Sequence, residues 1–488
     1  MASGRPRARA PSRSDNIPAM NESGKRVSWV ELYLDLVFVL AVGQLAHLLV
    51  AHPDMRHVWI VLGLFFVLWW TWVGFAVLSN RHGADDTPQR LLFLAASVPA
   101  GVAAVAIEPA STGDVAVFAL SLAAIRVVLA GAYGFRAGRT DLLRLRITRA
   151  CLISASLFAI SAGTPAPFRY VLWAIGIGVE SGAMLAEDRD AMRRMRRDRD
   201  LTALAPADPS EALDPHHFAE RFGLFLIILL GEVVVEAGQA AVDGDVATTA
   251  VWTALVAAMI LAASLWWVYF DSAAEINLKV LELSGGSPTM ARAIFAVGHM
   301  LPAFALLITA AGVGLLLEDD PPHIAAWLSC VGIGIYLLGT RVFLVADGRV
   351  SGLARALLLV ATFQLGRLQP ALGAYGYVWL LAAWVVMCAA LTTRTARGDE
   401  HAGDVDRYLG RRGAAGAGAG ATCSFAARSA KYRTDDVSAT IGAVSVAAIQ
   451  FRTARTASLN AMPTRPKTMY TAISMSAMRT IVPKTCHP

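Results

Sequence analysis

Carboxylates inside apolar segments are the residues of this sequence best suited to chemistry. The segment His217–Glu236 reads HFAERFGLFLIILLGEVVVE and is long enough to cross a bilayer. Glu220 and Arg221 lie near its start, and Glu232 and Glu236 lie well inside. A carboxylate in hydrocarbon costs about 2.5–3.5 kcal/mol or more. These acids therefore need a partner, a proton or water, and the chemistry that suits them is the binding of a cation or a proton.

A second pair of acids opens the first apolar segment. Glu31 and Asp35 are four residues apart, so they share one face of a helix. They lie within about 6 Å of its start. Two interpretations stay open: a hydrated interfacial pair that snorkels or caps the helix, or a vestibule that binds a cation or a proton. Glu220 opens its own segment in the same way.

Glu232 needs a partner from another segment, because Arg221 lies too far below it along the same helix. Arg126, in the middle of an apolar segment, and Arg341 are the candidates, and depth favours Arg126. Such an ion pair would either join two helices or act as a protonatable gate or substrate contact.

Two histidines also lie in apolar segments. His47 would either hydrogen-bond to a neighbouring helix or line a pathway. His299 is followed three residues later by Pro302, which removes a backbone donor and bends a helix. The bend would expose polar backbone to a cavity.

The elements that position these residues are membrane helices. Hydrophobic residues make up 56% of the 488 and charged residues 16%, where a soluble chain has about 25% charged residues. We therefore predict an all-α polytopic membrane protein, because long continuous apolar runs cross bilayers as helices. The twelve predicted spans lie near residues 30–50, 57–79, 91–107, 115–134, 148–162, 169–186, 218–238, 248–270, 293–317, 323–345, 354–368 and 376–392.

Lysines and arginines alternate with these spans. One side of the membrane collects 23 of them, and the other side only Arg56, Arg169 and Arg367. Because positive loops remain in the cytoplasm, this ratio predicts cytoplasmic N- and C-termini.

The chain divides into five regions by composition. Residues 394–488 hold 14 Lys/Arg and 6 Asp/Glu, so the basic charge belongs to this tail and predicts no nucleic-acid partner. The predicted regions are a disordered basic leader (1–29), a first membrane half (30–186), a charged cytoplasmic linker (187–217), a second membrane half (218–393) and a low-complexity, disordered tail (394–488).

The two membrane halves share an order of motifs. LWWTWV (Leu68–Val73) corresponds to LWWVYF (Leu265–Phe270), and Arg90-x-x-Phe93 corresponds to Arg292-x-x-Phe295. Both halves begin on the cytoplasmic side, so we predict a parallel repeat of six and six helices. Transporters often place a site at the interface of such repeats.

Five stretches form a distinctive combination: SWVELYLDLVFVLAVGQLAHLL (Ser28–Leu49), WWTWVGFAVLSNRHGADDTPQRL (Trp69–Leu91), ERFGLFLIILLGE (Glu220–Glu232), WWVYFD (Trp266–Asp271) and GHMLPAF (Gly298–Phe304). Together they resemble the bacterial low-temperature-requirement protein A family. The resemblance covers roughly residues 26–392 and implies a multi-pass protein of the bacterial inner membrane without an established activity. The chain departs from the family pattern at Val73–Phe75 and at Val233.

No nucleotide-binding, serine-hydrolase or zinc motif is present, so we name no catalytic residue, metal ligand or cofactor. The leading hypothesis is a transporter or channel for a small solute or ion within the lipid bilayer. A membrane enzyme handling lipid groups, with His47 or His299 as base, is one alternative. A non-catalytic protein whose buried charges fix helix packing is the other. The sequence does not indicate the oligomeric state.

Overall fold

The computed structural model describes residues 26–82, 86–135, 142–185, 204–206, 212–243, 249–340 and 352–396. Nearly all of the predicted leader, all of the predicted tail beyond residue 396, Arg341 and most of the predicted linker lie outside these residues. Within the described part, regular structure is helical and no strand occurs. The prediction of an all-α chain is confirmed for this part.

The first half of the chain forms a row of neighbouring helices. The helices are α1 (Trp29–Ala51), α2 (Met55–His82), α3 (Thr87–Val105), α4 (Ile107–Thr112), α5 (Ala116–Phe135), α6 (Leu142–Ser161) and α7 (Phe168–Leu185). α1 packs on α2 and α3, α3 packs on α5, α5 on α6, and α6 on α7.

The second half is built in a related order. Its elements are α9 (Pro215–Asp243), α10 (Thr249–Val268), the π-helix η3 (Tyr269–Ala273), α11 (Ala274–Leu283), α12 (Pro288–Ala291), the π-helix η4 (Arg292–Val297), α13 (Met300–Leu316), α14 (His323–Gly339), α16 (Gly352–Gln364), the 3₁₀-helix η5 (Leu365–Leu368) and α17 (Gln369–Ala396). α9 packs on α10 and α13, α13 on α14, α14 on α16, and α10 on α17.

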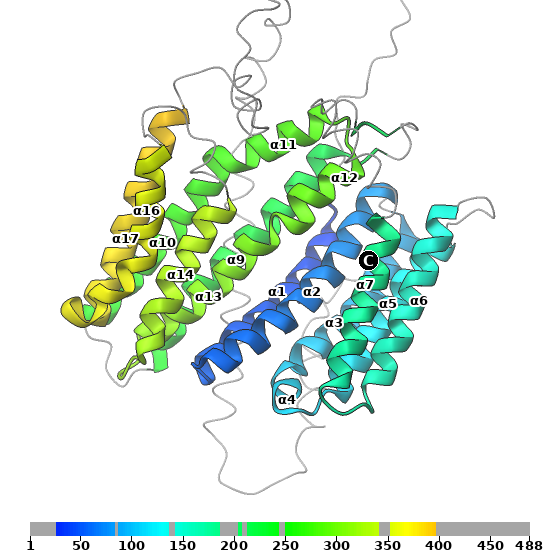
Figure 1. Cartoon of the computed structure of the whole chain (residues 1–488), viewed down its shortest axis with the longest axis horizontal. Coiled ribbons are helices and arrows are strands. Elements are labelled where there is room, and N and C mark those ends of the chain that lie inside the picture. The colour runs from blue at the N-terminus through cyan, green and yellow to red at the C-terminus, as the bar shows by residue number, and fades with distance from the viewer. Residues whose placement is uncertain are drawn as a thin grey trace, which may run out of the picture. The chain divides into compact units, whose positions relative to one another are not determined.

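The halves meet through their first helices. α1 contacts α9 and α13, and α2 contacts the same two helices. Figure 1 shows α1 and α2 beside α9 and α13, with α5, α6 and α7 on one side and α16 and α17 on the other. The residues predicted to do chemistry on α1 and α9 are thereby brought to one interface.

Capping residues in the sequence determine where two of these helices begin. Asp86 caps α3 by accepting a hydrogen bond from the Gln89 backbone N–H at 2.9 Å. Asp214 plays this part for α9, since Asp214 Oδ1 accepts from the backbone N–H groups of His216 (3.0 Å) and His217 (3.1 Å). Pro215 opens α9, where a missing N–H costs nothing. The cap fixes where His217 enters the bundle.

Seven helical stretches of the described chain are long and apolar enough to cross a membrane: Trp29–Ala51, Met55–Arg81, Thr87–Val105, Ala116–Phe135, Thr249–Leu283, Pro288–Leu316 and Ala356–Leu391. Large apolar side chains also face outward from them, such as Val98 and Val105 on α3 and Trp252 and Met259 on α10. Helices that are apolar on their outer face suit lipid. The chain is therefore a multi-pass membrane protein, while the count of twelve crossings stays a prediction.

Candidate functional site

Two acids from α1 and two basic residues from α9 meet inside the interface between the halves. Glu31 lies in the first turn of α1 and Asp35 one turn further on. His217 and Arg221 are likewise one turn apart on α9. All four side chains are 0–1% exposed. The sequence predicted these acids at a helix start, and the structure adds that they are buried and paired across the halves.

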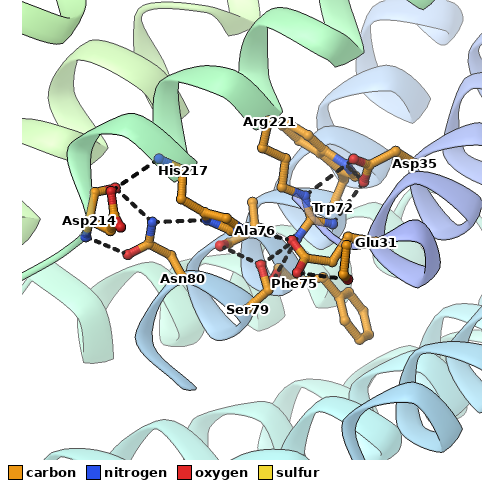
Figure 2. Close-up of polar contacts among 11 residues, drawn as sticks. Glu31, Asp35, Trp72, Phe75, Ala76, Ser79, Asn80, Asp214, His217 and Arg221 are labelled. Atoms are coloured by element: carbon orange, nitrogen blue, oxygen red, sulfur yellow. Dashed lines mark hydrogen bonds and ion pairs between the residues drawn. The ribbon is translucent and has the colours of Figure 1, made fainter. Parts of the chain in front are cut away.

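Arg221 binds both acids. Its Nε and Nη2 contact Asp35 Oδ2 and Oδ1 at 3.2 and 2.7 Å, and its Nη1 lies 3.2 Å from Glu31 Oε2. Nη1 also donates to the Phe75 carbonyl (3.3 Å) and to Ser79 Oγ, both on α2. Figure 2 shows the guanidinium enclosed by these acceptors. The two-pronged contact with Asp35 is the geometry that arginine makes best with a carboxylate.

α2 supplies the neutral part of the site. Trp72 and Ser79 are seven residues apart, two turns along one face, and both are buried. The Trp72 Nε1–H donates to Asp35 Oδ1 at 2.7 Å. The Arg221 guanidinium carbon also lies 5.9 Å from the Trp72 ring centroid and 5.7 Å from that of Phe93 on α3.

A chain of hydrogen bonds leads from Glu31 toward the start of α9. His217 Nε2 lies 3.0 Å from Glu31 Oε2, and His217 Nδ1 lies 3.2 Å from Asn80 Nδ2. The Asn80 amide makes two further bonds, both 2.9 Å, to the backbone of Asp214 (Figure 2). We call the set Glu31, Asp35, Trp72, Ser79, Asn80, His217 and Arg221 the Arg221 cluster.

An aromatic layer lies next along α2 and α9. Trp72 and Phe225 have ring centroids 4.2 Å apart, Trp72 and Phe222 4.7 Å, and Trp69 and Phe225 5.7 Å. Trp69 Nε1 also donates to the carbonyl of Ala296 in η4 at 2.7 Å. These buried rings separate the Arg221 cluster from the polar residues deeper along α9.

Glu232 and Glu236 lie about 17 and 22 Å beyond Arg221 along α9. A Cβ added to Gly43 of α1 would be 3.0 Å from Glu232 Oε1, so the glycine makes room for this carboxylate. A Cβ added to Gly314 of α13 would be 3.2 Å from the Glu236 Cβ. Glu232 is partly buried and Glu236 is 3% exposed. Both acids thus face the helices that form the interface between the halves.

His299 occupies a second polar position, between η4 and α13. Its Nε2 lies 2.6 Å from the Tyr269 hydroxyl of η3, and its Nδ1 lies 2.9 Å from the Ile294 carbonyl. Side chains bind two carbonyls of η4, since His299 contacts Ile294 and Trp69 donates to Ala296. The polar cavity predicted at Pro302 stays a prediction.

Arg126 does not pair with Glu232, and that prediction was wrong. Its Nε contacts Glu180 Oε1 of α7 at 2.9 Å and Ser154 Oγ of α6 at 3.0 Å. Its guanidinium also lies 3.9 Å above the Phe158 ring. α5 packs on α6 and α3, so depth alone was a poor guide to its neighbours. The Arg126–Glu180 pair stays within the first half.

Replacing Arg126 with methionine is expected to lower stability by about 3–5 kcal/mol, because the buried Glu180 loses its cation. Adding Glu180→Gln should recover most of the loss, and adding Glu232→Gln should recover none. Thermal unfolding in detergent measures all three variants. Equal recovery by both glutamine substitutions would contradict the pairing.

The remaining candidates lie at the helix surfaces. Glu220 and His47 are exposed, and the Glu220 carboxylate accepts a hydrogen bond from the Val27 backbone N–H and lies close enough to His217 and Glu31 to interact with them electrostatically. Within the described residues, no group of three His, Cys, Asp or Glu side chains is placed to hold a metal ion. Sequence reasoning missed His217 and Asn80. Their position could have indicated them: His217 lies in the first turn of α9 and Asn80 in the last turn of α2, and both helices pack on α1, which carries the two acids.

Comparison with known proteins places the site in a family context. The model of a family described as "Bacterial low temperature requirement A protein (LtrA)" matches residues 26–392. "Uncharacterized protein RA0937" of Rhizobium meliloti (strain 1021) is 29% identical over 299 residues, which cover 60% of this chain and 70% of that protein. No solved structure matches the chain. The matched region contains every residue of the Arg221 cluster.

Proposed function

The chain belongs to the bacterial low temperature requirement A family, and we propose that it is a secondary transporter or channel for a small solute or ion. The family resemblance predicted from the sequence is thereby confirmed. In this proposal twelve helices cross the bacterial inner membrane and both termini are cytoplasmic. The Arg221 cluster then lies at the cytoplasmic end of the bundle.

The order of helix contacts supports an internal repeat. In the first half α1 packs on α2 and α3, and in the second half α9 packs on α10 and α13. The next contact corresponds as well, because α3 packs on α5 and α13 packs on α14. One difference has a structural cause. Arg90 and Pro99 are nine residues apart, whereas Arg292 and Pro302 are ten apart. The π-helix η4 lies in that interval, and a π-turn accommodates one extra residue.

The observation that carries the proposal is the distribution of ionisable groups along the α1–α9 interface. The Arg221 cluster lies at one end, the aromatic layer follows, and Glu232 and Glu236 lie beyond it. Loss of hydration and the nearby Glu236 carboxylate raise the pKa of Glu318 in the loop after α13. Glu232, Glu236 and Glu318 thus form a series of acids that leads from the interior toward the surface opposite the Arg221 cluster. In this arrangement Glu232 and Glu236 contact the passing cation, and the Arg221 cluster is a closed cytoplasmic gate.

Two other functions fit particular observations. The Arg126–Glu180 pair, away from α9, fits a structural role in joining α5 and α7. A structural role also fits Arg221, whose guanidinium has acceptors on α1 and α2. An enzymatic use of His299 would require the ring to leave both of its present hydrogen bonds. Flux separates transport from these alternatives.

Ion flux into proteoliposomes tests the proposal. We expect the purified chain to dissipate an imposed proton or alkali-cation gradient faster than protein-free liposomes of the same lipid. An internal pH dye and a potential-sensitive dye report the two cases. Identical decay with and without the folded protein, for protons, Na⁺ and K⁺ alike, would contradict a cation pathway.

A further inference from the structure

The Asn80 amide has a defined orientation. The Asp214 backbone N–H donates to Asn80 Oδ1, and Asn80 Nδ2 donates to the Asp214 carbonyl, each at 2.9 Å. A flipped amide would set donor against donor and acceptor against acceptor. The atom that faces His217 Nδ1 at 3.2 Å is therefore the Asn80 nitrogen, which carries only hydrogens.

This contact determines the protonation state of His217. Because Asn80 Nδ2 can only donate, His217 Nδ1 must present its lone pair. The single ring proton then lies on Nε2, which donates to Glu31 Oε2 at 3.0 Å. A second ring proton would oppose N–H to N–H, so His217 is neutral while Asn80 stays in place.

Glu31 and Asp35 share one guanidinium. Arg221 Nε and Nη2 contact Asp35, and its Nη1 lies 3.2 Å from Glu31 Oε2. Glu220 of α9 lies close enough to this end of the helices to feel the charges of Arg26 and Glu31. Two buried carboxylates beside one guanidinium repel each other, and a proton on one of them removes this repulsion.

Ser28 connects Glu31 to water. Its hydroxyl lies 3.1 Å from Glu31 Oε1, and Ser28 is only partly buried. A hydroxyl donates to a carboxylate and can rotate to accept from a carboxylic acid. Oε1 can thus gain a proton while Oε2 keeps its contacts with His217 and Arg221.

We infer that Glu31 is a proton-binding site: a proton from cytoplasmic water bonds to Oε1 and is held by Ser28, while Asn80 keeps it off His217. This inference rests on the proposed function and identifies the proton as the coupled ion. An O–H bond forms at Oε1, and the water that delivered the proton is released. Protonation of Glu31 leaves the Arg221–Asp35 pair balanced and weakens the attraction of Arg221 for α1.

Infrared difference spectroscopy of the full chain in nanodiscs tests this site. On acidification we expect the C=O stretch of a protonated carboxylic acid, absent in Glu31→Gln and retained in the matched control Glu108→Gln, at an exposed position on α4. Ser28→Ala should shift the band, because the acid loses its acceptor. A band that is unchanged in Glu31→Gln would overturn the inference.

The ¹⁵N resonances of the His217 ring give a second test, assigned by their loss in His217→Gln. We expect a neutral ring with its proton on Nε2 throughout the titration of the carboxylic acid band. Asn80→Asp should convert the ring to the imidazolium form, because a carboxylate accepts a hydrogen bond from Nδ1–H and stabilises the positive ring. An imidazolium in the unmodified protein over the same pH range would overturn the inference.

The outcome is separable from that of the flux measurement. A Glu31-dependent band without flux would support the proton site and contradict transport. Flux combined with a band that does not depend on Glu31 would support transport and contradict Glu31 as the proton site.

Discussion

Replacing Arg221 with methionine is expected to destabilise the protein by about 3–5 kcal/mol, since removing one partner of a buried ion pair leaves an uncompensated charge. Asp35 would lose its two-pronged contact, and Glu31 would lose its nearest described cation. Methionine keeps much of the side-chain volume, so the loss reports charge rather than packing. Unfolding by denaturant in detergent, monitored by tryptophan fluorescence, measures the effect.

The double variant identifies the cause. Asp35→Asn combined with Arg221→Met should be more stable than Arg221→Met alone, because the amide carries no charge to strand. Arg149→Met, at an exposed position on α6, is the matched control and should change stability by no more than about 0.5 kcal/mol. If Arg221→Met matched this control, the cluster would not hold the halves together.

Glu232→Gln is expected to reduce cation flux about 10–100-fold while the protein stays folded. The substitution keeps the shape of the side chain and removes its charge. A hydrogen bond to a charged group is worth about 1.5–3 kcal/mol. A barrier raised by about 1.4–2.7 kcal/mol, close to this amount, slows the passage of the cation about 10–100-fold. Initial rates of gradient decay in proteoliposomes measure the effect.

Glu108→Gln is the control for that measurement, because Glu108 is exposed on α4 and the proposed pathway does not use it. It should retain the flux of the unmodified protein within about twofold, consistent with a surface substitution. Equal unfolding curves for both variants show that folding is intact. Full flux in Glu232→Gln would remove this residue from the pathway.

Apolar length was sufficient to predict the helices at the interface. The predicted span 30–50 corresponds to α1, and the predicted span 218–238 lies within α9. The sequence did not reveal the π-helices η3 and η4, because a one-residue insertion leaves hydropathy unchanged. Nor did it reveal the boundary between α3 and α4, since residues 102–108 around Ala106 contain neither proline nor glycine.

The site was only partly predictable. Charge and depth identified Glu31, Asp35 and Arg221 as candidates, because charged groups inside apolar helices are rare. Which cation meets which acid depends on helix contacts, and depth suggested the wrong partner for Arg126. Asn80 carries no charge, so its part in the hydrogen-bond chain emerges only from its distances to Asp214 and His217.

Access to Ser79 tests most directly whether the Arg221 cluster is a gate. Ser79 is 0% exposed and contacts Arg221 on the side of α2. In a chain whose other cysteines are replaced, Ser79→Cys would be labelled with a membrane-impermeant cationic thiol reagent from the cytoplasmic side. We expect slow labelling at rest and a large increase under an imposed proton gradient. Labelling that stays equally slow with and without the gradient would contradict a gate and assign the cluster to static packing.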